Sequence, residues 1–318
     1  MHDPLPIPSC FFSGDRTSDE GGSPAVSRAG QSAVVSVYRT KIAGHCRLIT
    51  VTWCKNLLVH GLSISVEGTG GEGGGGGEGD AHQQHHGCRV ELRPWHFWRK
   101  QGSRRLDVAG EAVDVLWDLR AARFCGEPEP RSGYYVAVVS GDEVVLLLGD
   151  MGKEAYRKSG SPPSPIDAIL VSKKEHVFGK KKFSTKAKFH EKGKLHDISI
   201  EFYSNSGGAG GADPEMVVKI DGQPTIHVRH LQWKFRGNEA ISVDKVRVEV
   251  YWDAHDWLFG PGMKHALFIF KPIHLVASPA TASASSPATT VAGGSTSDGG
   301  GGGGSSDFSL FLYAWKLE

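Results

Sequence analysis

One cluster of side chains that could act in catalysis or ligand binding lies in the segment YWDAHDW, residues 251–257. Two aspartates and a histidine lie within four positions there. A carboxylate beside an imidazole can act as an acid/base pair, because the carboxylate favours the imidazolium form. If the strand that starts near 243 continues, alternation places Asp253 and His255 on one face and directs Asp256 elsewhere. Two ligands are too few for zinc, which takes three or four protein ligands. The segment therefore favours the end of a strand, with ligand contact by Asp253 and His255 as the alternative.

A second cluster is basic, because residues 173–194 hold nine lysines against two glutamates. In the run KFSTKAKFH, the side chains of a strand would alternate between two faces. One face would carry Phe183, Thr185, Ala187 and Phe189, and the other Lys182, Lys186, Lys188 and His190. Such a lysine face predicts binding of phosphorylated protein, acidic lipid headgroups or an RNA backbone, weakening as salt rises. The alternative is a solvated edge strand whose lysines prevent aggregation.

Aromatic side chains alternate with polar ones in RHLQWKFRGNEA, residues 229–240, and an extended strand would place Leu231, Trp233 and Phe235 on one face. An aromatic platform of this kind could stack on a sugar ring, and a sandwich core uses the same alternation. A glucanase would need paired carboxylates on one strand, and the runs HDISIE and VEVYWD each offer only two acids. Residues 93–105 mix aromatic and basic side chains without an RNA-recognition motif, which disfavours nucleic acid.

The elements that must position these groups are short period-two runs of β-branched and aromatic residues. Hairpin turns are predicted at 140–142 and 221–222, where glycine supplies the positive φ of a tight turn. One short helix is predicted at 150–159. About fourteen strands without a long helical crossover favour an all-β fold, a two-sheet antiparallel β-sandwich of the jelly-roll or concanavalin-like kind. The last strand, near 308–317, returns to the sheet after a long segment.

Length and charge predict one domain, because the chain has 318 residues and a net charge of only +1. We expect residues 31–318 to form a single sandwich domain and residues 1–30 to be disordered or weakly ordered. The Gly/Ser-rich stretches near 67–87, 205–213 and 275–307 are expected to be disordered insertions, since they bury too little apolar surface. Five cysteines without a CxxC pair, no signal-peptide pattern and no long apolar run predict a cytoplasmic or nuclear protein without a membrane span.

Several of these segments together resemble the plant protein family catalogued as domain of unknown function 868. The resemblance is carried by PSCFF, VYRTKIAGHCRLITVTWCKNLLVHGLSISV, CRVELRPWHFWRKQGSRRLDV, VDVLWDLRAARFCGEPEPRSGYYVAVVSGDEVVLLLGDMGKEAYRK and VKIDGQPTIHVRHLQWKFRGNEAISVDKVRVEVYWDAHDWLF. It implies a plant protein with a single domain. It brings no established activity, cofactor or catalytic residue that can be transferred to this chain.

These observations predict a non-catalytic β-sandwich that binds a protein or an anionic ligand through a lysine-rich face. The candidate ligand contacts are Lys182, Lys186, Lys188, Trp233, Asp253 and His255. A lectin-like, carbohydrate-binding sandwich is the alternative, and a hydrolase that uses Asp253 and His255 has the least support. The sequence predicts no cofactor, no metal site and no catalytic residue.

Overall fold

The structure of the chain is a computed structural model that describes residues 31–56, 59–67, 85–92, 100–190, 193–205, 213–261, 264–273 and 308–317. The predicted N-terminal segment and most of the three predicted insertions lie outside these residues.

Seventeen strands and two helices occur in the described part. The first half of the chain contains β1 (Ser32–Ile42), β2 (His45–Asn56), β3 (Val59–Glu67), β4 (His85–Leu92), β5 (Gln101–Val108), β6 (Glu111–Asp118), β7 (Tyr135–Ser140), β8 (Glu143–Gly149) and α1 (Gly152–Ser159). The second half contains β9 (Ile169–Gly179), β10 (Lys182–Ala187), β11 (His196–Asn205), β12 (Asp213–Ile220), β13 (Gln223–Val228), β14 (Arg236–Val243), β15 (Val246–Asp253), α2 (His255–Phe259), β16 (His265–Ile273) and β17 (Ser309–Lys316).

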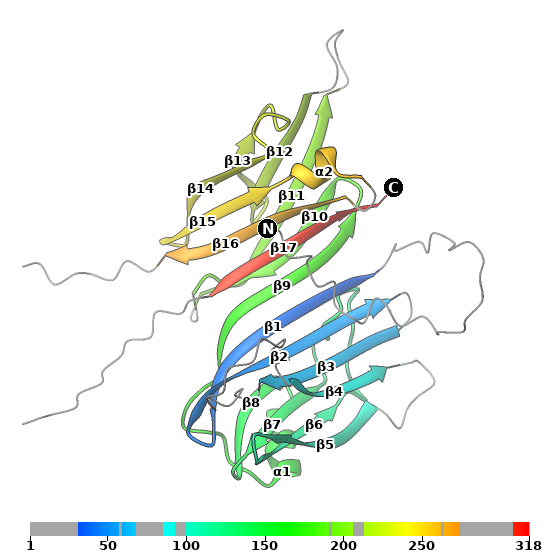
Figure 1. The fold of residues 1–318 in the computed structure, drawn as a ribbon, viewed down its shortest axis with the longest axis vertical. Coiled ribbons are helices and arrows are strands. Elements are labelled where there is room, and N and C mark those ends of the chain that lie inside the picture. The colour runs from blue at the N-terminus through cyan, green and yellow to red at the C-terminus, as the bar shows by residue number, and fades with distance from the viewer. Residues whose placement is uncertain are drawn as a thin grey trace, which may run out of the picture.

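The strands form three sheets (Figure 1). A nine-stranded sheet has the order β14-β15-β16-β17-β9-β1-β2-β3-β4 and runs the length of the molecule. The first small sheet has the order β5-β6-β7-β8, and the second small sheet has the order β10-β11-β12-β13. The long strands β1 and β9 pair near the middle of the nine-stranded sheet, so one continuous sheet serves both halves.

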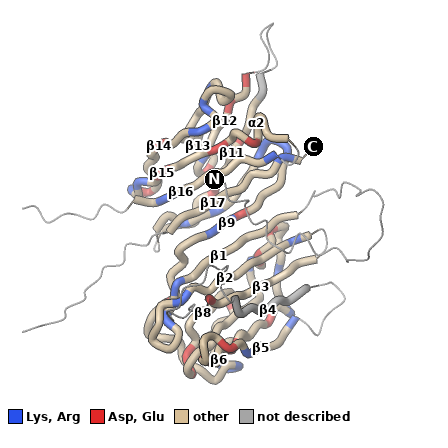
Figure 2. Tube along the Cα trace, in the orientation of Figure 1, with Lys and Arg blue, Asp and Glu red and all other residues tan. Residues whose placement is uncertain are grey.

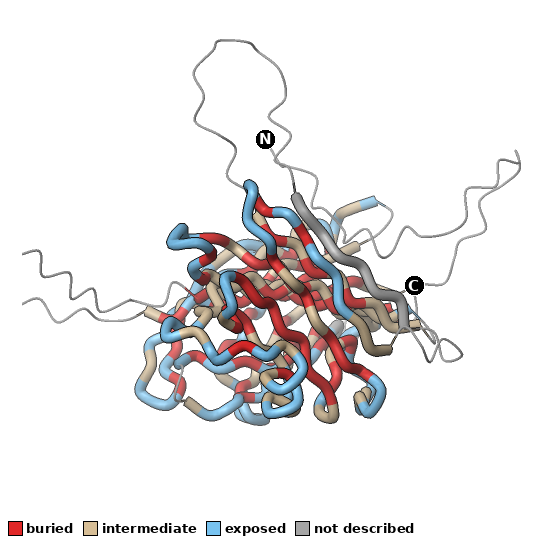
Figure 3. The backbone as a smooth tube through the Cα atoms, turned by 90° about the horizontal axis from the view of Figure 1, so that it is seen from below, coloured by how far each residue is buried: buried red, intermediate tan, exposed pale blue. Residues whose placement is uncertain are grey.

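Each small sheet packs on one half of the nine-stranded sheet and encloses its own core. The first core joins β1–β3 to the first small sheet and includes Trp53, Val115 and Val138. The second core joins β9 and β14–β17 to the second small sheet and includes Phe202 and Phe268. Buried positions alternate with exposed ones along the strands and lie between the layers (Figure 3). This is the period-two pattern that the sequence predicts.

Both small sheets cover the same face of the nine-stranded sheet. Tyr38 of β1 lies directly opposite Leu170 of β9, and directly opposed residues project to the same face. Tyr38 packs against the first core, whereas Leu170 packs against the second core. The two small sheets therefore sit next to each other on a common floor, with the β1–β9 pair beneath their junction.

The all-β class and the two predicted hairpins are confirmed, because β7 pairs with β8 and β12 pairs with β13 across the expected turns. The two-sheet jelly-roll arrangement is not confirmed, since the strands form three sheets. Local patterns cannot reveal that β1 and β9 continue one sheet through both halves. The last strand does return to the sheet, but β17 pairs with β9 in the parallel direction.

Two helices are present instead of one, and the second begins where the sequence analysis continues a strand. The Asp253 carboxylate accepts a hydrogen bond from the backbone N–H of His255 at 3.0 Å, which ends the strand and starts α2. Neither helix in the described residues has the length and apolar character needed to span a membrane.

Candidate functional site

Asp253 and His255 do not form the predicted side-chain pair. Asp253 Oδ2 accepts a hydrogen bond from Arg236 Nε at 2.8 Å. Its Oδ1 accepts the hydrogen bond from the backbone N–H of His255. The partner of His255 is Asp256, whose Oδ1 lies 3.0 Å from His255 Nδ1. Asp256 is expected to point away from the histidine only if the strand continues, and β15 ends at Asp253, as the favoured interpretation of the segment has it. Strand alternation therefore does not apply at His255, where α2 begins. Val248, Val250 and Trp252 of β15 are buried, as is Ala254 just after the strand.

The alternation predicted for residues 182–190 is confirmed. Phe183, Thr185, Ala187 and Phe189 are buried, and Lys182, Lys186, Lys188 and His190 are exposed. Strand β10, which carries most of this run, is an edge strand of the second small sheet.

Part of the lysine face is neutralised by neighbouring carboxylates. Lys182 lies 3.2 Å from Glu201 and Lys186 lies 3.3 Å from Asp197. Lys188 makes no ion pair within the described residues. Positive and negative side chains are interspersed along the strands of both halves (Figure 2). The lysine face is therefore much less positive than the count of lysines indicates.

Trp233 lies in a turn and not in the predicted strand. The backbone N–H groups of Trp233 and Lys234 both donate to the carbonyl of His230, which has a positive φ of 55°. This turn sends Leu231 into the core and leaves the Trp233 side chain 79% exposed. Phe235 instead contacts His255 and Phe259. The prediction that Leu231, Trp233 and Phe235 share a face is wrong.

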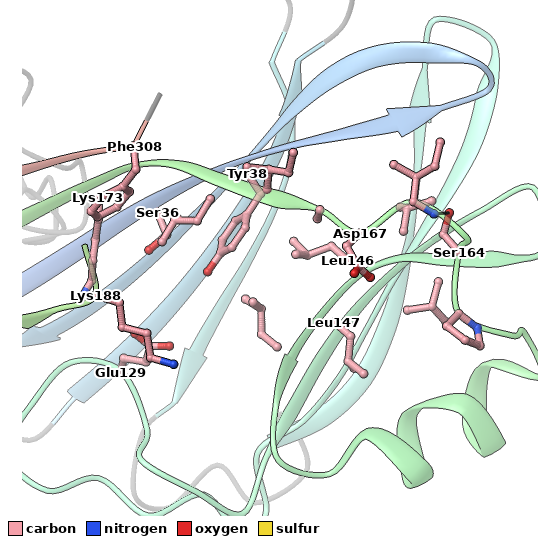
Figure 4. A pocket seen from close by; sticks show the side chains of 18 of the residues that line it. Ser36, Tyr38, Glu129, Leu146, Leu147, Ser164, Asp167, Lys173, Lys188 and Phe308 are labelled. Carbon is pink, nitrogen blue, oxygen red and sulfur yellow. Dashed lines mark hydrogen bonds between the residues drawn. The ribbon is translucent and has the colours of Figure 1, made fainter. Parts of the chain in front are cut away.

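A cleft that the sequence analysis does not identify lies between the two small sheets (Figure 4). We call it the inter-sheet cleft, and its volume is about 680 Å³. Its floor comes from β1 and β9 of the nine-stranded sheet, including Ser36, Tyr38 and Lys173. One wall is the edge strand β8 with residues 163–170, and the other is residues 186–190 at the end of β10. Two of the predicted ligand contacts, Lys186 and Lys188, therefore line this cleft.

A network of charged and hydroxyl groups lies at one end of the inter-sheet cleft. Lys173 Nζ is 2.5 Å from Glu175 Oε1, and the other oxygen of the buried Glu175 accepts a hydrogen bond from the Thr185 hydroxyl. Lys173 Nζ also lies 3.5 Å from the Lys186 carbonyl. A smaller hollow of about 250 Å³ shares Lys173, Lys186 and Glu129 with the cleft. This network ties the floor to the second small sheet.

Glu129 reaches the same end of the cleft from the chain between β6 and β7. Its Oε1 accepts a hydrogen bond from the Tyr134 hydroxyl at 3.1 Å. Removal from water raises the pKa of Glu129, and the positive charge of Lys173 opposes this effect. Burial, followed by the charge of Glu129, raises the pKa of Tyr38 to about 12. Tyr38 is therefore a neutral hydroxyl at physiological pH and can donate a hydrogen bond to a ligand.

The other end of the inter-sheet cleft is mainly apolar, although Ser164 and Asp167 also line it. Leu146 and Leu147 of β8 line it together with Ile166, and the Ile166 side chain is 45% exposed. Leu195, which precedes β11 on the opposite side, also lines the cleft and is 54% exposed. Figure 4 shows Leu146, Leu147 and Ser164 toward one end of the cleft, and Lys173, Lys188 and Glu129 toward the other, with Tyr38 between them. The same figure shows Asp167 beside Leu146 and Phe308 beside Lys173. The lysines thus gather at one end of the cleft, and the other end is mainly apolar with one carboxylate.

Sequence reasoning misses the cleft because its residues come from segments far apart in the chain. Ser36, Glu129, Leu146, Lys173 and Lys188 share no motif and meet only when the two small sheets lie side by side. One local signal was present. Ser36 in SAVVSVYRT and Glu175 in ILVSKKEHV are polar residues that become buried within otherwise strand-like runs. A buried polar group needs a partner, so such positions mark places where other elements converge.

Comparison with known proteins gives a family and no function. Residues 29–316 match a family model described as a plant protein of unknown function (DUF868), which confirms the resemblance seen in the sequence. No curated protein and no solved structure matches the chain.

Proposed function

Since the chain belongs to this family of plant proteins of unknown function, we propose its function from the geometry of the inter-sheet cleft. The protein is a binding module that holds an anionic ligand between the two small sheets. The observation that carries the proposal is that Lys186 and Lys188 line the cleft beside Lys173 and the hydroxyl groups of Ser36 and Tyr38. These groups offer ammonium and hydroxyl donors to an anion.

Lys186 and Lys188 can bind a ligand without the loss of a strong interaction within the protein. Lys186 and its partner Asp197 are 44% and 70% exposed, and an exposed ion pair contributes about 0–1 kcal/mol to stability. Lys188 has no competing ion pair within the described residues. A bound anion would therefore gain attraction from both lysines without breaking a strong internal interaction.

Binding has more support than catalysis because the acid at the lysine end of the cleft already has a partner. Glu129 accepts a hydrogen bond from the Tyr134 hydroxyl, and Glu175 beside the cleft contacts Lys173 and accepts a hydrogen bond from the Thr185 hydroxyl. The third acid, Asp167, lines the opposite end of the cleft. The hydrolase alternative loses support for a similar reason, since Asp253 is engaged by Arg236 and His255 by Asp256.

The test is titration with small anions followed by nuclear magnetic resonance. We expect phosphate and butyrate to shift the amide resonances of residues that line the cleft, and the charge-reversal variant K186E/K188E to weaken binding at least about 10-fold at low salt. The matched control is K153E/K158E, which makes the same change in net charge on exposed positions of α1. Equal affinities of the two variants would overturn the proposal.

Carbohydrate binding remains a second candidate because of one observation, the 79% exposed side chain of Trp233. An exposed indole can stack on the apolar face of a sugar ring. Titration with a panel of plant cell-wall oligosaccharides, followed by tryptophan fluorescence, tests this candidate. A change in emission that is lost in W233A would support it, and no change with any oligosaccharide would reject it.

A further inference from the structure

The wall formed by β8 indicates which kind of anion the inter-sheet cleft takes. Strand β8 is the edge of the first small sheet, and its run Val144–Leu148 lines the cleft without a charged side chain. Residues 163–170 continue this wall with Ile166, Ala168 and Ile169, and also with the exposed carboxylate of Asp167. Val144, Val145 and Leu146 are buried, so the apolar surface open to a ligand comes from Leu147, Leu148 and Ile166. A phosphate or a short carboxylate held by the lysines would leave this surface uncovered.

Two exposed aliphatic side chains line the cleft from different elements, and Leu195 lies beside Lys188 because His196 pairs with Ala187. Ile166 and Leu195 are two of only six large hydrophobic residues that are clearly exposed in the described part of the chain. One belongs to the segment before β9 and the other precedes β11, yet both line the inter-sheet cleft. Large apolar side chains are kept at a cleft when a ligand covers them, because their exposure to water is unfavourable.

Charge and size restrict the ligand further. The cations Lys173 and Lys188 lie toward the end of the cleft opposite Leu146 and Leu147 (Figure 4). A volume of about 680 Å³ is within the range of small-molecule sites, roughly 300–1,000 Å³. A ligand that complements the whole cleft has one anionic end and one apolar end.

We propose that the ligand of the inter-sheet cleft is an amphipathic anion, an alkyl or acyl chain that carries one carboxylate or phosphate group. This inference rests on the function proposed above and names its ligand class. The anionic group contacts Lys186 and Lys188, and the chain lies along Leu147 toward Ile166. Leu195, beside Lys188, contacts the part of the chain next to the anionic group.

The test compares alkyl carboxylates of increasing length by isothermal titration calorimetry. Butyrate, octanoate and decanoate are used below the concentrations at which they form micelles, and decanol is the uncharged control. Each buried methylene contributes about 0.8 kcal/mol, which predicts affinity rising by up to about fourfold per methylene. Decanol should bind at least about 10-fold more weakly than decanoate, because it lacks the charge that the lysines recognise.

Two variants test whether Ile166 and Leu195 contact the alkyl chain of the ligand. I166S/L195S should flatten the dependence of affinity on chain length, and both positions are exposed, so the fold tolerates the change. The control F259S removes an equally exposed apolar side chain near the end of α2, away from the cleft, and should keep the full dependence. An unchanged dependence in I166S/L195S would overturn the assignment of the chain to this wall.

The outcomes separate this inference from the proposed function. If butyrate and phosphate bind but chain length has no effect, the amphipathic ligand is wrong and the anion-binding function stands. If no anion binds, both fail.

Vesicles of phosphatidylcholine with phosphatidylserine distinguish a free ligand from a membrane surface. Uptake of decanoate from solution without sedimentation on vesicles supports the inference, whereas sedimentation without uptake overturns it.

Discussion

At the scale of single residues, His176 is held neutral by its surroundings. Its side chain is buried on β9 and stacks on Tyr313 with 4.7 Å between ring centres. Trp315 Nε1 donates a hydrogen bond to His176 Nδ1 at 3.1 Å, so Nδ1 must be the unprotonated nitrogen. Burial, aided by the charges of Lys174 and His265, lowers the pKa of His176 from its ordinary value of 6.5 to about 4.

This lowered pKa predicts a loss of stability in mild acid. The unfolded chain gains a proton on His176 below pH 6.5, and the folded chain does so only near pH 4. The free energy of unfolding is therefore unaffected by this residue above pH 6.5 and falls between pH 6.5 and pH 4, by about 2 kcal/mol at pH 5. Guanidinium unfolding of wild type and H176N at pH 7.5 and pH 5 measures this change in the free energy of unfolding.

The Asn variant is the appropriate comparison because its side-chain oxygen can still accept the Trp315 hydrogen bond. H176N should lose about 2 kcal/mol less stability than wild type between the two pH values. The same loss in both proteins would mean that folding leaves the pKa of His176 at its ordinary value, which would contradict the prediction.

At the scale of elements, each half of the molecule places a tryptophan over a cross-strand glycine. Gly102 of β5 lies opposite Trp117 of β6, and Gly237 of β14 lies opposite Trp252 of β15. A Cβ atom added to Gly237 would lie 2.4 Å from the Trp252 ring, and one added to Gly102 would lie 2.7 Å from the Trp117 ring. The indole covers the space that a side chain would occupy, an arrangement that pins strand register.

This packing predicts that a single methyl group is costly at Gly237. The Trp252 ring also donates a hydrogen bond to the Lys234 carbonyl at 3.0 Å, so it cannot move aside without losing that bond. We expect G237A to lower the free energy of unfolding by about 1–3 kcal/mol, as for other overpacked sites. N238A, at the exposed next position, should change it by less than about 0.5 kcal/mol. Thermal unfolding measures both, and similar melting temperatures would contradict the prediction.

The predictions for the inter-sheet cleft also belong to the scale of elements, because its walls are the edges of two sheets. Neither β8 nor β10 forms a complete site, and the lysines of β10 act beside Lys173 of β9. The anion titration with K186E/K188E and the chain-length titration with I166S/L195S therefore test how the two small sheets are placed next to each other as well as what they bind.

At the scale of the whole molecule, the two cores depend on one sheet. Strands β1 and β9 pair over seven residue positions and belong to different cores, so separating the halves would break a central ladder. The Lys173–Glu175–Thr185 network joins β9 of this ladder to the second small sheet. We therefore expect the two halves to unfold together.

A substitution that creates a cavity in one core tests whether the two halves unfold together. V113A in the first core should destabilise the protein by about 1–3 kcal/mol. It should also speed hydrogen exchange of β16 and β17 in the second core. F268A in the second core is the reciprocal variant, with an expected effect on β6 and β7. Two separate unfolding transitions, with protection lost only in the mutated half, would show that the halves are independent.

The sequence by itself determines the strands and their faces. Alternation in KFSTKAKFH predicts which side chains are buried, and glycines predict the turns at 140–142 and 221–222. These features depend on neighbours a few residues apart, because a strand has a period of two and a tight turn needs a particular φ. The family is also recognisable from the sequence, through segments distributed along nearly the whole chain.

Tertiary structure decides how the strands are combined and which side chains meet. The sharing of one sheet by two cores, the parallel return of β17 and the inter-sheet cleft depend on residues more than a hundred positions apart. Local packing also overrides alternation at Trp233 and His255, where a turn and a helix replace the expected strands. Pairing between distant strands gains its free energy from burial that no short segment encodes, so only the fold brings Glu129, Lys173 and Lys188 to one cleft.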